Sequence, residues 1–448
     1  MRNHIRAALA LAALSLPCAS AAAAPSPGSG TAWDLLEGLT SEIGQRMAGS
    51  EREAAARDWA VLRLKALGFA NVRAEPFTIR GYVRGDDRAM LTTPYRQSLA
   101  ITALGYSAPT PAGGITADLV YFPTLDALRA APDGSLKGKI AFIDHAMRPN
   151  QDGSGYGPYG QVRRQGPAIA SGKGAIGVVI RSIGTDSHRN PHTGVTNFPA
   201  GTTPIPAGAV SNPDADLIAR IAARGKPMSL ALTLTSHPQD GMPSGNVIGE
   251  LPGRDPGLPP ILVGCHLDSW DLGTGAIDDA AGCAIVAAAA LRAQEGGKPL
   301  RTIRVLWAGS EEIGGFGGTA YAKAHGTEPH ALAMESDFGA DRVWRVQMSF
   351  ADANKPLADR IAAALGPLGI VRGGGKADGG TDVEPIIEAQ KLAVVEMSQD
   401  GTRYFDLHHT PDDTLDKVDP AQLDQNVAAW TAVLKIVANE AGAIAPTQ

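Results

Sequence analysis

One segment of this chain places a histidine and two carboxylates at a change of secondary structure. His266 and Asp268 follow the apolar run 260–264, and Asp278 opens an alanine-rich run that continues to Glu295. The first run is typical of a buried strand and the second of a helix. These side chains are therefore expected where a strand gives way to a helix, which is where open α/β sheets bind their ligands.

Three further strand-like runs also lead to side chains that bind metals. The runs are 301–310, 331–334 and 391–397, and the side chains beyond them are Glu311 and Glu312, Glu335 and Asp337, and His408 and His409. An isolated Glu-Glu pair is most simply a solvated acidic turn, but a bound cation would remove the repulsion between its carboxylates. Imidazoles and carboxylates without a thiolate cluster suit Zn, Mn or Co. There are more donors here than one catalytic zinc needs, so two metals sharing a carboxylate are expected.

With these motifs the chain resembles the co-catalytic zinc exopeptidases, the family of bacterial leucyl aminopeptidases and plasma glutamate carboxypeptidase (carboxypeptidase Q). The resemblance rests on His-Leu-Asp-Ser-Trp-Asp at 266–271 and His-Thr-x-x-Asp-Thr at 409–414, and it begins at 43–50. It therefore covers nearly all of the mature chain. It implies an α/β fold, a three-layer sandwich with a central mixed, mostly parallel sheet flanked by helices, and a β-rich insert that resembles protease-associated domains.

The resemblance also implies a set of metal ligands for two Zn²⁺ ions. Mn or Co ions are the expected substitutes for zinc at these positions. The five ligands are His266, Asp278 as the carboxylate that bridges both ions, Glu312, Asp337 and His409. His409 is preferred to His408, and Asp337 to Glu335, by alignment with the family motifs. Glu312 and Asp337 are expected to complete opposite ions.

Further roles follow from the same resemblance. Glu311 is expected to be the general base that takes a proton from water and returns it to the leaving amine. Asp268 is expected to hold the imidazole of His266 in its ligating tautomer, and Asp413 to support His409 in a similar way.

Three residues are candidates for contact with the substrate. Tyr404 and His408 compete for the role of oxyanion donor, because relatives use a tyrosine near the last histidine ligand. The glycine-rich loop 373–382 is expected at the substrate-binding edge, with Asp382 close to the free amine of the substrate.

The implied activity is that of a dinuclear zinc exopeptidase, which cleaves short peptides as an aminopeptidase or dipeptidase. A hydroxide that bridges the metals would attack the scissile bond. One alternative is a glutaminyl-cyclase-like zinc enzyme on the same fold, which would hold one zinc. Another is a binding protein without catalysis. Such a protein would lack some of the metal-ligand residues, whereas this sequence has a suitable residue at all five ligand positions. The preferred end of the peptide stays open, and homodimerisation is suggested by relatives alone.

The rest of the chain indicates export and two domains. Residues 1–23 read as a signal peptide, so a secreted or periplasmic enzyme is expected. Lipid anchoring at Cys18 is disfavoured, because the preceding residues do not suit that processing. The catalytic domain is expected at 31–110 and 239–445, and the insert at 111–238, with strands at 117–122, 139–143, 175–180 and 205–211.

Other classes of protein are disfavoured. The net charge of −6 argues against a nucleic-acid partner, and no segment after the signal peptide is long and apolar enough to span a membrane. The segment 155–160 satisfies G-x-G-x-x-G, but it follows no strand and carries Pro158 where a helix should begin, so a dinucleotide site is not expected. Cys265 and Cys283 remain after cleavage, and the sequence leaves open whether they pair.

Overall fold

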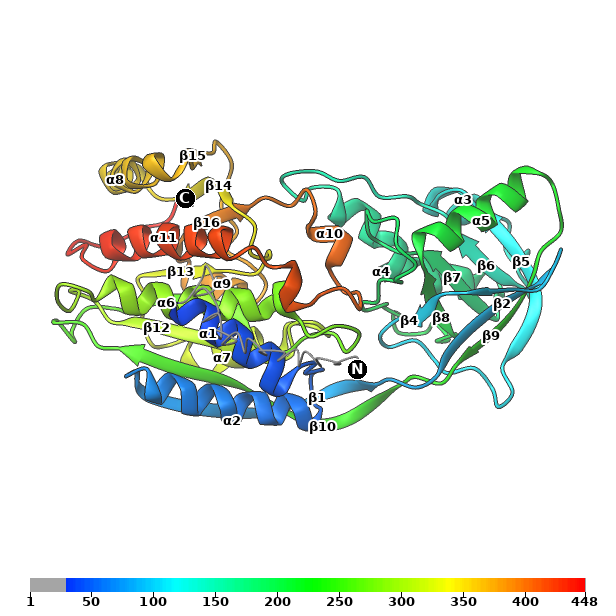
Figure 1. The fold of residues 1–448 in the computed structure, drawn as a ribbon, viewed down its shortest axis with the longest axis horizontal. Coiled ribbons are helices and arrows are strands. Elements are labelled where there is room, and N and C mark those ends of the chain that lie inside the picture. The colour runs from blue at the N-terminus through cyan, green and yellow to red at the C-terminus, as the bar shows by residue number, and fades with distance from the viewer. Residues whose placement is uncertain (1–29, 448) are drawn as a thin grey trace, which may run out of the picture.

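A computed structural model of the chain describes residues 30–447. The expected signal peptide and Cys18 lie outside the described residues. Two lobes are connected by the long antiparallel strands β1 (Ala70–Val83) and β10 (His237–Leu251), which run from one lobe to the other (Figure 1). No helix of residues 30–447 is both long and apolar enough to cross a membrane.

The first lobe is built on an eight-stranded mixed sheet in the order β1-β10-β12-β11-β13-β16-β14-β15. Its other strands are β11 (Ile261–His266), β12 (Ile303–Ala308), β13 (Leu332–Glu335), β14 (Val343–Ser349), β15 (Val371–Arg372) and β16 (Ala393–Gln399). The central strands β12, β11, β13 and β16 are parallel. Their carboxyl ends therefore lie at one edge of the sheet.

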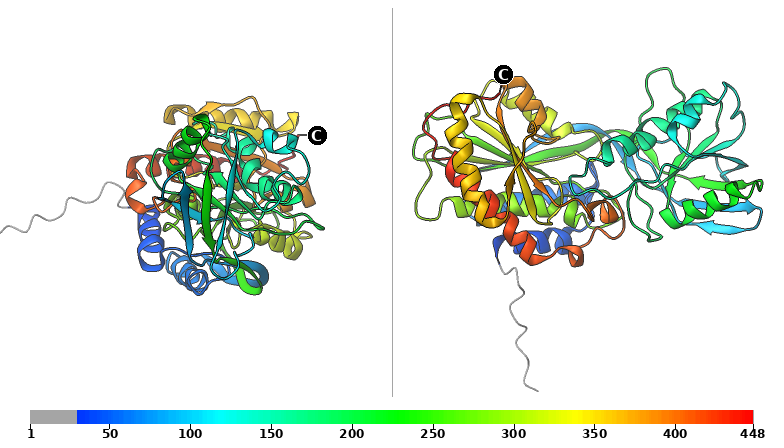
Figure 2. Two further views of the ribbon diagram at one scale, coloured as in Figure 1. Left: turned by 90° about the vertical axis from the view of Figure 1, so that its right-hand side faces the viewer. Right: turned by 90° about the horizontal axis from the view of Figure 1, so that it is seen from above.

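Helices cover both faces of this sheet, so the predicted mixed sheet flanked by helices is confirmed (Figure 2, right). The helices are α1 (Thr31–Gly38), α2 (Glu51–Ala66), α6 (Ala281–Ala293), α7 (Phe316–His325), α8 (Lys355–Leu365), α9 (Glu384–Gln390), α10 (Tyr404–Leu407) and α11 (Pro420–Val437). Short helical turns are η1 (Leu39–Ile43), η2 (Ala276–Ala280), η3 (Asp352–Asn354), η4 (Gly366–Leu368) and η5 (Leu415–Lys417). In β11, Val263 packs with the cluster under α1, α6 and α11, while the adjacent Leu262 packs toward α7 and α9.

The second lobe has its own eight-stranded sheet, in the order β3-β2-β9-β5-β6-β7-β8-β4. The strands are β2 (Asp87–Thr93), β3 (Gln97–Leu99), β4 (Ile101–Ala103), β5 (Ile115–Phe122), β6 (Ile140–Ile143), β7 (Gly177–Arg181), β8 (Ala207–Val210) and β9 (Ser229–Leu234), and the helices are α3 (Leu125–Ala130), α4 (Tyr156–Gly172) and α5 (Asn212–Ala223). Strands β5 to β8 correspond to the four predicted ones.

The second sheet begins earlier than the predicted insert. Strands β2, β3 and β4 precede residue 110 and nevertheless belong to this sheet. The change in composition near residue 110 marks a loop inside the lobe, and the chain leaves the first sheet between β1 and β2. The division into domains, and the protease-associated type of the second, stay predictions.

Helix α4 begins where the sequence argued against a helix. It starts at Tyr156, and Pro158 lies in its first turn. A proline is tolerated there, because the first N–H groups of a helix have no partner within the helix. The ring of Tyr156 stacks on Phe405 of α10, with 4.7 Å between ring centroids, so α4 of the second lobe meets α10 of the first (Figure 1).

Candidate metal centre

The carboxyl ends of three parallel strands bring the predicted donors together. His266 is the last residue of β11, Glu311 and Glu312 follow β12, and Asp337 lies two residues beyond β13. Because β11 pairs with both β12 and β13, these side chains meet at the middle of the sheet edge. His409 arrives from the segment after α10.

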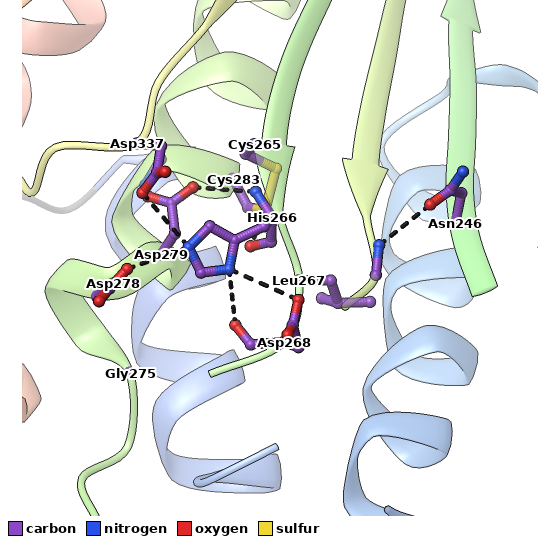
Figure 3. Close-up of a disulfide and its surroundings, with 12 residues drawn as sticks. Asn246, Cys265, His266, Leu267, Asp268, Gly275, Asp278, Asp279, Cys283 and Asp337 are labelled. Atoms are coloured by element: carbon purple, nitrogen blue, oxygen red, sulfur yellow. Dashed lines mark hydrogen bonds and ion pairs between the residues drawn. A yellow bond between two sulfur atoms is a disulfide. The ribbon is translucent and has the colours of Figure 1, made fainter. Parts of the chain in front are cut away.

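Asp278 lies between two groups of donors. Its Oδ1 is 3.1 Å from Nε2 of His266, and its Oδ2 is 3.3 Å from Nε2 of His409. Asp337 Oδ1 lies 3.3 Å from the same His266 nitrogen, and Glu312 Oε2 lies 3.0 Å from the same His409 nitrogen. The Asp278 carboxylate is thus shared by a His266–Asp337 group and a His409–Glu312 group, and Figure 3 shows the first of them.

The separations and the charge of these donors fit bound cations. Two ligands at about 2.1 Å from a tetrahedral ion lie about 3.4 Å apart, close to the observed spacing. Burial and the nearby Asp278 raise the pKa of Glu312 well above its usual range, and burial raises the pKa of Asp337. Burial also raises the pKa of Glu311 to about 8. So many buried carboxylates repel one another, and cations held between them would relieve that repulsion.

Other nearby donors are occupied or more distant. Asp279 accepts hydrogen bonds at 3.1 Å from the backbone N–H groups of His266 and Gly282, so it fixes the start of α6. Glu335 Oε2 accepts from two backbone N–H groups, at 2.9 and 3.0 Å. His408 Nε2 lies 3.6 Å from Asp278, farther than that of His409. The geometry therefore favours the predicted five, whose roles as ligands stay predictions.

Asp268 supports the site in a different way from the one expected. Nδ1 of His266 is 3.0 Å from the backbone carbonyl oxygen of Asp268 and 3.7 Å from its carboxylate. The carboxylate accepts hydrogen bonds from the backbone N–H groups of Glu311, at 3.0 Å, and Glu312, at 3.3 Å. The carbonyl thus orients the imidazole, and the carboxylate holds the Glu311–Glu312 turn.

The partner of His409 comes from the second lobe. Its Nδ1 lies 3.2 Å from the backbone carbonyl oxygen of Thr193, between β7 and β8. Asp413, the expected partner, instead accepts a hydrogen bond from the backbone N–H of Ile277, at 2.7 Å. A backbone carbonyl carries no signature in the sequence, so this contact could not be predicted.

A cavity of about 350 Å³ opens over the donors, and two of the three predicted substrate contacts line it. Tyr404 and His408 are among its walls, and the ring of Tyr404 stacks on Phe338 with 4.5 Å between centroids. Asp382 does not line the cavity. Its carboxyl is fully buried, and neither oxygen has a hydrogen-bond partner in residues 30–447. In this conformation Asp382 is not placed to meet a substrate amine.

Arg46 is a supporting residue that sequence reasoning did not single out. Its side chain is fully buried and donates hydrogen bonds to the backbone carbonyl groups of Leu267, Thr274 (2.6 Å) and Gly275 (2.9 Å). It therefore clamps both ends of the loop between His266 and Asp278. A lone arginine in a sequence is most simply a surface residue, which is why its role was missed.

We expect Arg46→Met to destabilise the protein and to weaken metal binding. The substitution removes four hydrogen bonds to backbone carbonyl groups, which should lower the free energy of unfolding by about 3 kcal/mol or more. Urea denaturation of wild type and variant measures this loss. Arg148→Met, at an exposed position, is the matched control and should unfold as the wild type does. Equal stability of the two variants would contradict the role given to Arg46.

Cys265 and Cys283 form a disulfide, which settles the alternative left open by the sequence. The S–S distance is 2.08 Å, and the bond connects the end of β11 to α6 (Figure 3). The segment that it closes contains both His266 and Asp278. The disulfide and Arg46 thus both restrain the segment that carries His266 and Asp278.

Comparison with known proteins identifies the family. The model of peptidase family M28 matches residues 246–434. Carboxypeptidase Q of Bos taurus is 32% identical over 413 residues, which are 91% of this chain and 85% of that protein. The chain belongs to peptidase family M28. This M28 peptidase is a hydrolase, and its substrates are peptides.

Solved structures agree with this assignment. A peptidase M28 precursor from Shewanella amazonensis is 44% identical, with a TM-score of 0.91 over 94% of this M28 peptidase and 96% of that chain. BSAP, a zinc aminopeptidase from Bacillus subtilis, is 20% identical, with a TM-score of 0.64 over 93% and 97% of the two chains. The second likeness shows a shared fold.

Proposed function

We propose that this M28 peptidase is a dinuclear zinc exopeptidase that removes single residues from short peptides, as an aminopeptidase or dipeptidase. The position of Asp278 carries the proposal, because its two carboxylate oxygens face different histidines. His266 and Asp337 would hold one ion, His409 and Glu312 would hold the other, and Asp278 would bridge them. Zinc ions bound there would supply Lewis acidity, which polarises the scissile carbonyl and lowers the pKa of water.

Glu311 is the proposed general base. It lines the cavity, its backbone is held by Asp268, and its carboxylate accepts no hydrogen bond from another group in residues 30–447. A free carboxylate beside the scissile bond can take a proton from the attacking water and deliver it to the leaving amine. Tyr404 and His408 line the same cavity and carry the donors available to the developing oxyanion.

The second lobe, proposed to be of protease-associated type, would form one side of the substrate cavity. It contributes Tyr156, Arg163, Arg164 and Val195 to the cavity wall. The Cys265–Cys283 disulfide supports an exported enzyme, because such bonds persist in oxidising compartments.

Metal analysis together with a peptidase assay tests the proposal. Purified protein should contain two equivalents of zinc and hydrolyse leucylglycine and leucine p-nitroanilide. Removal of the metal by a chelator should abolish both activities, and added zinc should restore them. One zinc per chain with cyclisation of an amino-terminal glutamine would favour the glutaminyl-cyclase alternative. Zinc-loaded protein that cleaves neither substrate would contradict the proposed function.

A further inference from the structure

Helix α4 places two consecutive arginines on the wall of the cavity. Arg163 and Arg164 line the same cavity as Glu311 and His409. Neither guanidinium forms an ion pair with a carboxylate of the residues that the structure describes. Two adjacent cations facing the reaction site without a counter-ion are unusual, because buried charges in proteins are normally paired.

The guanidinium of Arg163 is held by hydrogen bonds, whereas that of Arg164 has N–H groups without an acceptor among the described residues. Arg163 is buried and donates hydrogen bonds to the hydroxyl of Tyr156, at 2.6 Å, and the carbonyl of Thr193, at 3.1 Å, while its buried Nε has no partner. Arg164 is partly buried and donates to the carbonyl of Gly157, at 2.9 Å. Its remaining N–H groups are available for a ligand in the cavity.

Bound metals would increase the excess of positive charge in the cavity. Bound cations would neutralise the carboxylates around Asp278, whereas Arg163 and Arg164 would keep their charge. Burial, together with the neighbouring Arg163, lowers the pKa of Arg164, in agreement with a cation that lacks a partner. An anion carried by the substrate would supply the missing counter-charge. In a short peptide this anion is the terminal carboxylate, which a guanidinium binds with two parallel hydrogen bonds.

A neighbouring cavity has a different charge from the one beside α4. A second cavity of about 250 Å³ shares Asp337, Phe338 and Thr381 with the first. Its further charged walls are Asp152, Glu335, Asp378, Glu396 and Arg345. This mostly acidic cavity repels a carboxylate and suits an amine. The charges that line the two adjoining cavities therefore favour a dipeptide whose carboxylate lies toward α4.

We propose that Arg164, with Arg163 beside it, binds the free carboxylate of the substrate, so that the enzyme acts as a dipeptidase. This inference rests on the proposed function, since it names the substrates of the same site. Unblocked dipeptides should therefore be cleaved faster than dipeptides whose carboxyl end is an amide.

Arg164→Gln tests this assignment with a matched pair of substrates. Wild type should cleave leucylglycine about tenfold to a hundredfold more efficiently, as kcat/KM, than leucylglycinamide, the range expected for one charge-assisted contact. Arg164→Gln should lose most of this preference through a higher KM for leucylglycine, with the amide and the zinc content unchanged. Arg164→Lys should recover part of it. Arg220→Gln, at an exposed position of α5 in the same lobe, is the control and should keep the wild-type ratio.

The outcomes separate this inference from the proposed function. Equal cleavage of acid and amide by the wild type would overturn the role of Arg164 while leaving the peptidase intact. An Arg164→Gln variant that lost activity equally on both substrates would also overturn it, since that pattern indicates a structural role. Zinc-loaded wild type that cleaves neither substrate would contradict the proposed function itself.

Discussion

Glu311→Gln is expected to abolish turnover while leaving the zinc content unchanged. Glutamine has the size of glutamate and keeps the backbone N–H that donates to Asp268, so the turn after β12 should be preserved. It has no basic oxygen that can take a proton from water. Loss of a general base typically lowers the rate by roughly 10²-fold or more.

Steady-state hydrolysis of leucylglycine and zinc analysis of the same preparation measure the two parts of this expectation. Glu384→Gln makes the same change at an exposed position at the start of α9, so it should leave kcat and zinc content at wild-type values. A Glu311→Gln enzyme with wild-type kcat would remove Glu311 from the mechanism. A variant that had lost zinc would show that Glu311 is a ligand.

Asp278→Asn and Asp337→Asn are expected to differ in how much metal they lose. Asp278 faces both histidines, so its replacement should weaken both metal positions. Asp337 faces His266 alone, so its replacement should weaken one. At each affected position the loss of affinity should exceed the roughly 10–100-fold that removal of a supporting partner costs.

Zinc per chain after dialysis separates these variants. Asp337→Asn should retain about one equivalent and Asp278→Asn close to none, and the thermal midpoint should fall in the same order, because metal that binds the folded state stabilises it. Asp416→Asn, at an exposed position near His409 in sequence, is the control and should keep both ions. Equal zinc retention by Asp278→Asn and Asp337→Asn would exclude the bridging role of Asp278.

Three of the five donors could be placed from the sequence because they follow strands. Apolar runs that lead to His266, Glu312 or Asp337 imply parallel strands whose carboxyl ends meet, and β11, β12 and β13 do meet there. Family motifs then selected His409 and Asp337 from their neighbours, and the distances agree with that choice.

The contacts that orient these donors were not predictable in the same way. Thr193 acts through a carbonyl that every residue has, and Arg46 acts through a fold that brings it to a distant loop. Asp382 lies in a glycine-rich loop typical of a binding edge, yet packing buries its carboxyl. The start of α4 was missed because Pro158 suggested a break, although a proline in a first turn is compatible with a helix.

The contact between Thr193 and His409 makes the second lobe a component of the candidate metal centre. A truncated enzyme that kept the whole first sheet and every predicted ligand would still lack the acceptor that sets the tautomer of one histidine. Any movement of α4 and the β7–β8 loop relative to α10 would likewise change the hydrogen bond of that imidazole. A second lobe grafted from a relative would therefore have to bring a backbone carbonyl to the same place to keep this contact.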